Sequence, residues 1–428
     1  MRSAIDQLMN LPRYALDGSS AIHPGFERIA ALLSVMNHPE KDLSVALVAG
    51  TNGKGSVSSM MAAILTADGV RTGLHTSPHL LHVSERMRVD GIAPSVDWME
   101  KQCALFHLLF VSTGASFFEA TFALSLLWFA EQHATHAVVE VGLGGRLDAT
   151  NVLNADVCVI TGVALDHTDL LGDTIEKIAV EKAGIIKQDK PIILGNMPSE
   201  ARSEIEFVAK RLNAPLSIAS NGMTITSQKD ARVLISTGHG SLPPIRLQLK
   251  GEHQLGNTIT ALTALEQWMP SIAPSSIQQG LKNVSTLSGL RARTEIISYN
   301  PVLMVDVGHN PDAVSYALST FIHACNGIES HTGASCVIIG LMADKDAVEV
   351  AKILKKHNLP VLTVPIRGLR GQSEKTLQKT LMDVGVSEVS SHSSVKRAMD
   401  WARQSNSNCL VLGSHMVAAE ALSNDLGM

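Results

Sequence analysis

Short runs of apolar, often β-branched residues recur along the chain, each followed by a turn containing glycine and by a stretch with helical spacing. In the first half these runs cover Ser44–Ala49, Ala137–Val141, Asp156–Val163 and Pro191–Gly195. A second series covers Val302–Val307, Ser335–Gly340, Val361–Pro365 and Cys409–Gly413. This rhythm of strand, turn and helix predicts an α/β protein with mostly parallel sheets. Ligands of such sheets gather at the carboxyl ends of the strands, so polar residues just beyond these runs are candidates for function.

The stretch from 213 to 250 departs from this rhythm, because polar and apolar residues alternate there. It predicts a β-hairpin excursion before a helix at Thr258–Trp268. The chain has 428 residues, whereas single hydrophobic cores stop growing at about 250–300 residues. We therefore expect two domains, 1–288 and 289–428, with the boundary in the segment Ser285–Arg293 between the two series.

Composition narrows the classes of partner. The chain is 45 % hydrophobic and 18 % charged with a net charge of -5, so it is not basic enough to predict nucleic-acid binding. The longest apolar stretch, Phe117–Ala130, is too short to span a bilayer and predicts a buried helix. The N-terminus has no apolar run typical of a secretory signal, and the five cysteines form no CxxC pair. These features predict a cytoplasmic protein without membrane or nucleic-acid partners.

The strongest local motif lies between a predicted strand and a predicted helix, and it reads Gly50-Thr51-Asn52-Gly53-Lys54-Gly55-Ser56. Backbone N–H groups of a glycine-rich turn, together with a helix N-terminus, suit phosphate oxygens, and Lys54 would reach the β- and γ-phosphates of a nucleotide. The usual pattern has Ser or Thr after the lysine to hold Mg²⁺, but here Gly55 has no hydroxyl. Protein ligands of Mg²⁺ must therefore come partly from elsewhere.

Three later strand ends offer such ligands. Ser77, Glu140 and His167 each follow or end an apolar run. A hydroxyl, a carboxylate and an imidazole can complete a Mg²⁺ shell with phosphate oxygens and water. Taken singly, a serine before proline is usually a turn residue and a lone histidine a hydrogen-bonded structural group. Glu140 differs, because a buried carboxylate needs a partner. Spacing alone does not show that the three converge.

Several of these stretches together resemble the folylpolyglutamate synthase/dihydrofolate synthase family of the Mur ligase superfamily. The similar stretches, in order, are Gly50–Ser56, Ser77–Leu80 with Glu85-Arg86, Glu140–Asn151, Ala164–Gly172, Glu181–Ile185 and Asp306–Pro311. The resemblance implies an N-terminal P-loop ATPase domain with a mostly parallel sheet, joined to a smaller Rossmann-like α/β domain. It also implies an ATP-dependent ligase that couples glutamate to a folate-type carboxylate.

The resemblance implies roles at the phosphate end of the site. Thr51 to Lys54 would hold the ATP phosphates, Ser77 and Glu140 one Mg²⁺, and His167 a second. Lys182 matches a lysine that is carbamylated in this family, a change that converts an ammonium group into a carboxylate-like ligand. Without that modification Lys182 would repel a metal ion, and a solvated helix lysine is the alternative interpretation.

The resemblance implies further contacts with the nucleotide and with glutamate. Asn257 would contact adenine and Asp306 the ribose, while His309 would approach glutamate or the phosphates. Ser414 is similar to a serine of the glutamate site. Relatives have a Pro-Gly-Arg turn whose arginine contacts ATP. At the corresponding place this chain has both Arg291 and Arg293, and counting back from Asp306 favours Arg293.

Two stretches match the family's pterin pocket, Ser116-Phe117-Phe118-Glu119 and Leu147-Asp148-Ala149. The alternative interpretation of the first is the start of a core helix. A third stretch, Ile22-His23-Pro24-Gly25, departs from the Ile-Asp-Leu-Gly of bifunctional relatives. The missing aspartate leaves open how the pterin end is held and whether the enzyme has one activity or two.

The implied chemistry is transfer of the γ-phosphoryl group of ATP to a carboxylate, followed by attack of the glutamate amine on the acyl phosphate. Such an enzyme would use ATP, two Mg²⁺ and a monovalent cation such as K⁺, and we expect a monomer that closes around ATP to exclude water. The acceptor is dihydropteroate, a reduced folate or both. Two alternatives are a peptidoglycan-type Mur ligase and a nucleotide-dependent switch that hydrolyses ATP slowly without glutamate.

Overall fold

The computed structural model describes residues 3–13, 25–227, 232–237, 240–326, 334–368 and 371–425. These residues divide into two compact units, each with its own sheet. The first comprises 1–248 and 254–290, and the second comprises 249–253 and 291–428. The units therefore divide between Leu290 and Arg291, but five residues from before that point also belong to the second unit.

The first unit is built on a seven-stranded sheet with the order β3-β2-β4-β1-β5-β6-β7. Its strands are β1 (Ser44–Ala49), β2 (Thr72–His75), β3 (Met87–Val89), β4 (His136–Glu140), β5 (Val157–Ile160), β6 (Ile192–Leu194) and β7 (Leu216–Ile218). All neighbours are parallel except β2 and β3. Val48 pairs with Glu140, and Ala49 pairs with Ile160. The carboxyl ends of the three central strands therefore meet at one edge, as the sequence predicts.

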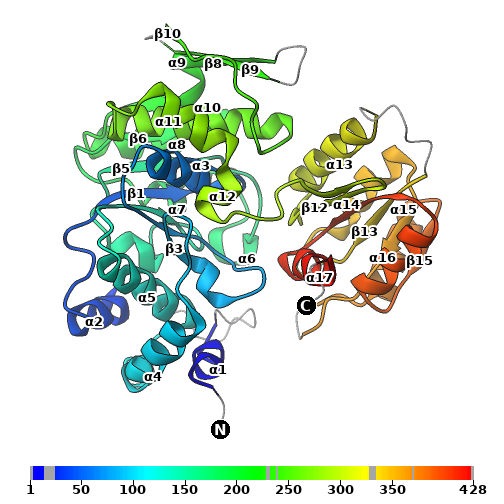
Figure 1. Ribbon diagram of the computed structural model, residues 1–428, viewed down its shortest axis with the longest axis horizontal. Helices are drawn as coiled ribbons and strands as arrows, with labels where there is room; N and C mark the ends of the chain where they lie inside the picture. Colours follow the sequence, from blue (N-terminus) through cyan, green and yellow to red (C-terminus); the bar gives the residue numbers. More distant parts are fainter. Residues whose placement is uncertain are drawn as a thin grey trace. The chain divides into compact units, whose positions relative to one another are not determined.

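Helices cover the sheet because consecutive strand residues, which point to opposite faces, are apolar. The helices of the first unit are α1 (Ala4–Met9), α2 (Glu27–Val35), α3 (Lys54–Ala67), α4 (Val96–Ser112), α5 (Phe117–Glu131), α6 (Thr168–Leu171), α7 (Ile175–Ala183), α8 (Ser199–Arg211), α9 (Ala219–Gly222), α10 (Glu252–Trp268), α11 (Pro274–Lys282) and α12 (Val284–Ser288) (Figure 1). Helix α10 belongs to this unit from Gln254 onward.

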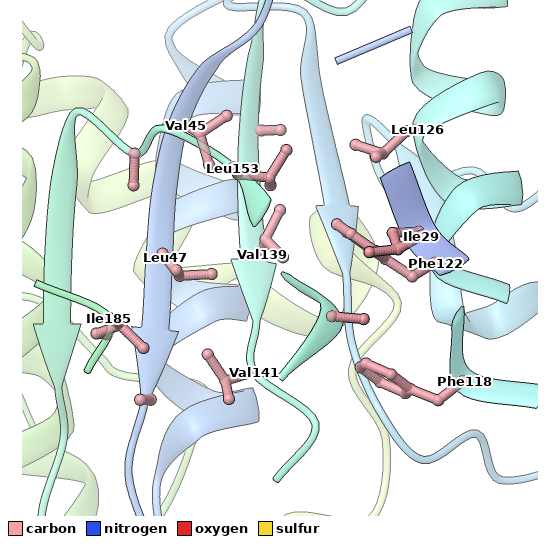
Figure 2. Packing of buried hydrophobic residues seen from close by; sticks show 14 of the residues in the cluster. Ile29, Val45, Leu47, Phe118, Phe122, Leu126, Val139, Val141, Leu153 and Ile185 are labelled. Atoms are coloured by element: carbon pink, nitrogen blue, oxygen red, sulfur yellow. The ribbon is translucent and has the colours of Figure 1, made fainter. Parts of the chain in front are cut away.

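The core beside α5 illustrates this packing. Val45 and Leu47 of β1 and Val139 of β4 lie in one buried cluster with Phe118 and Phe122 of α5 (Figure 2). Phe118 lies at the end of the cluster toward which the strand arrows point. The predicted buried helix is thus confirmed, and its first residues sit at the edge where strand ends gather. No helix in the described parts of the chain has the length and apolar character that a membrane crossing requires.

The excursion between 213 and 250 is only partly the hairpin that alternation predicts. Strand β7 joins the parallel sheet, and the antiparallel part is a separate sheet of β8 (Met223–Ser227), β9 (Val233–Thr237) and β10 (Gly240–Ser241). The hairpin prediction was wrong for β7, because Leu216 pairs with Ile192 of β6, a contact that local alternation cannot reveal. The following helix also begins earlier than predicted, at Glu252.

The second unit has a six-stranded sheet with the order β11-β12-β16-β13-β14-β15. Its strands are β11 (Glu295–Tyr299), β12 (Val302–Val305), β13 (Ser335–Ile339), β14 (Val361–Thr363), β15 (Val389–Ser391) and β16 (Asn408–Leu412). Its helices are α13 (Pro311–Asn326), α14 (Ala347–His357), α15 (Glu374–Val384), α16 (Val395–Gln404) and α17 (His415–Asp425). Only β11 is antiparallel to its neighbour. The four predicted strands of this half are present, whereas β11 and β15 were not predicted, because they carry few buried residues.

Candidate active site

The phosphate loop joins β1 to α3 at the carboxyl edge of the first sheet. Gly53 adopts a left-handed conformation with φ 86° and caps α3, whose first residue is Lys54. The Thr51 hydroxyl donates to the carbonyl oxygen of Ala164 at 3.1 Å, and Thr161 Oγ1 donates to the carbonyl oxygen of Asn52 at 2.6 Å. These bonds fix the loop to the segment after β5. The strand, turn and helix that the motif predicts are all present.

Glycine is required at two points of this loop. A Cβ on Gly50 would lie 1.9 Å from Thr161 Oγ1, and a Cβ on Gly53 would lie 2.6 Å from Asn257 Oδ1. Asn257 also donates to Gln254, which donates in turn to Ser56 Oγ. The structure therefore brings Asn257, which is 204 positions farther along the chain by residue number, against the loop.

Two lysine side chains converge on the loop. Lys54 Nζ donates to the carbonyl oxygens of Gly50 and Thr51 at 3.0 and 3.2 Å, and Lys182 Nζ donates to Gly50 at 3.0 Å. Lys182 is 2 % exposed, and this burial, reinforced by the charge of Lys54 and opposed by Asp166, lowers its pKa to about 7. It is not the solvated lysine of the alternative interpretation. Sequence reasoning did not single out Asp166, which directly precedes His167 and whose charge acts on Lys182.

Ser77 and Glu140 also come together. Strands β2 and β4 are parallel neighbours, and the backbone N–H of Ser77 donates to Glu140 Oε2 at 3.0 Å. The Glu140 side chain is buried, with the residue 4 % exposed. His167 is exposed, has φ 50°, and donates its backbone N–H to Asp166 Oδ1. Within the described residues no three His, Cys, Asp or Glu side chains form a ready-made metal cluster.

The two stretches matched to a pterin pocket meet at Gly142. A Cβ on Gly142 would lie 2.6 Å from the Phe118 ring and 3.1 Å from Asp148 Oδ2. Burial raises the pKa of Asp148, whose carboxylate accepts from Leu143 N and from the amide and hydroxyl of Thr150. Leu147 is 39 % exposed and Ala149 is buried. Ile22, His23 and Pro24 lie outside the described residues, and Gly25 directly follows them.

Glu119 has a structural role at the start of α5. Its carboxylate accepts from the backbone N–H and hydroxyl of Ser116 at 2.8 and 2.7 Å, which forms a capping box. Arg28 Nε donates to both of its oxygens at 3.1 Å. Phe118 packs edge-to-face against His75, with ring centroids 5.8 Å apart. These contacts anchor α5 at the edge where the strand ends converge.

In the second unit, polar residues likewise cluster beyond the strand ends. Asp306 follows β12 and accepts from Thr294 N and Gly308 N at 2.7 and 2.6 Å; burial raises its pKa against the opposing charge of Arg293. The backbone N–H of Gly413 donates to Gly308, which brings the His309 and Ser414 loops together. Ser414 Oγ accepts from Val417 N and so caps α17.

The two candidate arginines of the linker have different surroundings. Arg291 Nε forms an ion pair with Glu295 Oε1 at 2.6 Å. Arg293 lies close enough to Asp306 and His253 for its charge to act on both groups. Arg293, rather than Arg291, therefore lies near Asp306, which follows β12, and near His253 of α10.

Comparison with known proteins agrees with this geometry. Residues 48–265 match the Mur ligase middle domain, and residues 292–415 match the Mur ligase glutamate ligase domain. The dihydrofolate synthase/folylpolyglutamate synthase of Escherichia coli is 34 % identical over 94 % of this chain and 91 % of the relative. A probable bifunctional folylpolyglutamate synthase/dihydropteroate synthase of Haloferax volcanii is 32 % identical over 98 % of this chain, which spans 50 % of that relative.

Solved structures are similar over the whole chain. E. coli FolC in complex with DHPP and ADP has a TM-score of 0.84 at 30 % identity, covering 100 % of this chain and 98 % of that one. The Yersinia pestis bifunctional enzyme complexed with AMPPNP and a Mn ion has a TM-score of 0.83 at 29 % identity, covering 100 % and 99 %. The chain therefore belongs to the dihydrofolate synthase/folylpolyglutamate synthase family of Mur ligases.

Proposed function

We propose that the protein is an ATP-dependent ligase that adds L-glutamate to dihydropteroate and to reduced folates through an acyl phosphate. The observation that carries this proposal is the convergence, at one sheet edge, of the phosphate loop, the buried Lys182 and the Ser77–Glu140 pair. The surface formed by Phe118 and Asp148 adjoins the same edge and suits a flat heterocycle. Relatives named dihydrofolate synthase/folylpolyglutamate synthase, with structures that hold DHPP and ADP or AMPPNP and L-glutamate, support the same function.

The residues of the phosphate loop neutralise the charge of the ATP phosphates and hold them in position. The N–H groups of Thr51 to Lys54 and the Lys54 ammonium bind the ATP phosphates, so that the acceptor carboxylate can attack the γ-phosphorus in line. The bond from the γ-phosphorus to the bridging oxygen breaks and ADP leaves. The glutamate amine then displaces phosphate from the acyl phosphate and forms an amide. In the second unit Arg293 and Asp306 would bind the nucleotide, and His309 and Ser414 would bind glutamate.

The donor set fits Mg²⁺. Glu140 has a buried carboxylate that accepts the backbone N–H of Ser77, and this carboxylate and the Ser77 hydroxyl are oxygen ligands of the kind that Mg²⁺ prefers. Mg²⁺ commonly takes one or two carboxylates with substrate phosphates. When bound, it would neutralise phosphate charge. We further propose that His167 and a carbamylated Lys182 serve a second Mg²⁺ and that a monovalent cation such as K⁺ assists. We also propose that the protein is a monomer and acts in the cytoplasm.

The test is phosphate release from Mg·ATP with L-glutamate, comparing dihydropteroate, tetrahydrofolate and no acceptor, with products identified by mass. We expect acceptor-dependent release and the addition of one glutamyl unit. A Lys54→Ala variant should abolish both, whereas Lys177→Ala, which removes an exposed ion pair with Asp173, should change neither. Phosphate release that ignores both acceptors and yields no glutamyl product would contradict the proposal and favour a nucleotide-dependent switch.

A further inference from the structure

Two guanidinium groups lie over one buried aromatic ring at the start of α5. The Cζ atoms of Arg13 and Arg86 are 4.8 and 4.9 Å from the centroid of the Phe117 ring. Phe117 is 5 % exposed and Arg86 is 6 % exposed, whereas Arg13 is exposed. Cation–π attraction accounts for part of this arrangement, but each ring–cation contact is modest and does not neutralise the charge.

Backbone and side-chain contacts hold both arginines in place. The N–H of Phe117 donates to the carbonyl oxygen of Pro12 at 2.9 Å, which brings Arg13 to the first turn of α5. Arg86 ends the short helix Val83–Arg86, and its Nε donates to His79 Nδ1 at 2.9 Å. The arrangement is therefore built by three separate segments of the chain.

The positive charge of this cluster is not balanced by a contacting acid. The nearby Glu85 carboxylate accepts instead from the backbone N–H groups of Leu80, Leu81 and His82. In the part of the chain that the structure describes, the terminal nitrogens of Arg86 have no hydrogen-bond or ion-pair partner, and Arg13 reaches only the carbonyl oxygen of Met9 at 3.4 Å. Glu140 and Glu85 act on Arg86 through their charge only, so the guanidinium forks of the two arginines suit hydrogen bonds to an anionic ligand.

The cluster lies between two parts of the proposed site. Phe117 directly precedes Phe118, whose ring borders the proposed pterin surface. On the other side, the charge of Glu140, the proposed metal ligand, acts on Arg86. An anion bound here would therefore lie between the heterocycle and the reacting carboxylate of an acceptor.

We propose that Arg13 and Arg86 bind the α-carboxylate of the glutamyl residue that a reduced folate carries and a pteroate lacks. The proposal rests on the proposed function. A guanidinium fork suits a carboxylate, and it discriminates between the two acceptors because only the glutamylated one has this extra anion. The reacting carboxylate is a poorer occupant, because a tight guanidinium pair would withdraw the electrons with which it attacks phosphorus.

The test compares tetrahydrofolate with tetrahydropteroate, which differ by that glutamyl residue, as ligands of the full-length protein in isothermal titration. Tetrahydrofolate should bind more tightly to the wild type. Arg86→Gln and Arg13→Gln should each weaken tetrahydrofolate binding about 10- to 100-fold, the loss expected for hydrogen bonds to a charged group. Tetrahydropteroate binding should change by less than about threefold. Arg86→Lys, which keeps the charge but loses the fork, should fall between.

Arg71→Gln is the matched control, since it removes a surface guanidinium of the same unit that pairs with Asp90, and it should leave both affinities unchanged. An equal loss for the two ligands would overturn the inference, because the arginines would then serve the reacting carboxylate or the fold. Weaker binding of free L-glutamate, with the folate ratio unchanged, would overturn it in favour of the incoming amino acid. A wild type that binds both ligands but forms no glutamyl product would refute the proposed function instead, while the affinity ratio would still decide this inference.

Discussion

Lys54 and Lys182 donate hydrogen bonds to the same acceptor, the carbonyl oxygen of Gly50, each at 3.0 Å. One lysine belongs to the phosphate loop and the other to α7, so the contact joins two segments that are far apart in the sequence. Two ammonium groups at one carbonyl oxygen repel each other, and the buried one, Lys182, loses its proton more readily. Burial and the Lys54 charge lower the pKa of Lys182 to about 7, which makes its amine available for chemistry near neutral pH.

Lys182 is expected to react with carbon dioxide, because only a neutral amine forms a carbamate. The uncharged fraction of Lys182 rises as the pH rises through about 7, so carbamylation should rise over the same range at constant dissolved carbon dioxide. Labelled bicarbonate should give one carbamate signal in the ¹³C NMR spectrum of the wild type and none in Lys182→Ala. Ligase activity of the variant should fall about 10- to 100-fold, as for loss of a group that supports a metal site.

Lys177→Ala is the control for this change, because it removes an exposed lysine of the same helix. It should keep the carbamate signal and the activity. A carbamate signal that persists in Lys182→Ala, or full activity of that variant, would contradict the assignment.

Glu140→Gln is expected to raise the Mg²⁺ concentration that gives half-maximal activity by about 10- to 100-fold. The amide keeps an oxygen that can accept the N–H of Ser77, but it removes the charge that attracts the cation. Thermal unfolding without Mg²⁺ should occur at an unchanged or higher temperature, since a buried carboxylate is costly. Glu131→Gln, at a carboxylate that accepts from Trp98 Nε1, should leave the Mg²⁺ dependence as it is; a parallel shift in both variants would refute the metal role.

Gly53→Ala is expected to weaken ADP binding by at least about tenfold. The left-handed φ of 86° costs a non-glycine residue about 1–2 kcal/mol, and the new Cβ would also push Asn257 Oδ1 away from 2.6 Å. Gly69→Ala is a matched control with φ 81° and open space around its Cβ, so it should lose stability without losing ADP affinity. Titration calorimetry and thermal unfolding separate the two effects. Similar ADP affinities for the two variants would argue against a nucleotide role for the Asn257 contact.

His75 is expected to make the first unit sensitive to acid. Burial, with a smaller contribution from Arg86, lowers the pKa of this imidazole from 6.5 to about 3, and Ser125 Oγ lies 2.8 Å from its Nδ1. The unfolded chain therefore binds a proton that the folded one does not. Stability from this group is complete above pH 6.5 and is lost as the pH falls toward 3, by up to about 1.4 kcal/mol per pH unit.

Urea unfolding of His75→Gln should accordingly show a shallower pH dependence between pH 6.5 and 3 than the wild type. His107→Gln, at a partly exposed position on α4, serves as the control and should follow the wild type. Identical slopes for His75→Gln and wild type would mean that the buried imidazole does not contribute to acid sensitivity.

Much of the first unit follows from local sequence. The range Ser44–Ala49 is predicted and observed without change, and the helix after the loop begins at Lys54, because a buried apolar run and a glycine-rich turn determine both locally. The start of α5 is also encoded locally, since Ser116 and Glu119 form a capping box three residues apart. The missing hydroxyl at Gly55 also predicts that protein ligands of Mg²⁺ come partly from another segment.

The tertiary structure alone decided which distant residues meet. Ser77 reaches Glu140 because β2 and β4 are neighbours, although they are not consecutive strands. Lys182 is buried rather than solvated because α7 packs beside the phosphate loop. Arg13 lies at Phe117 because the N–H of Phe117 donates to the carbonyl oxygen of Pro12. The physical reason is that hydrogen bonds within a turn or helix join residues that are near in sequence, so the sequence predicts them. Strand order, burial and the pKa shifts that burial causes depend on contacts between distant residues, which sequence spacing does not encode.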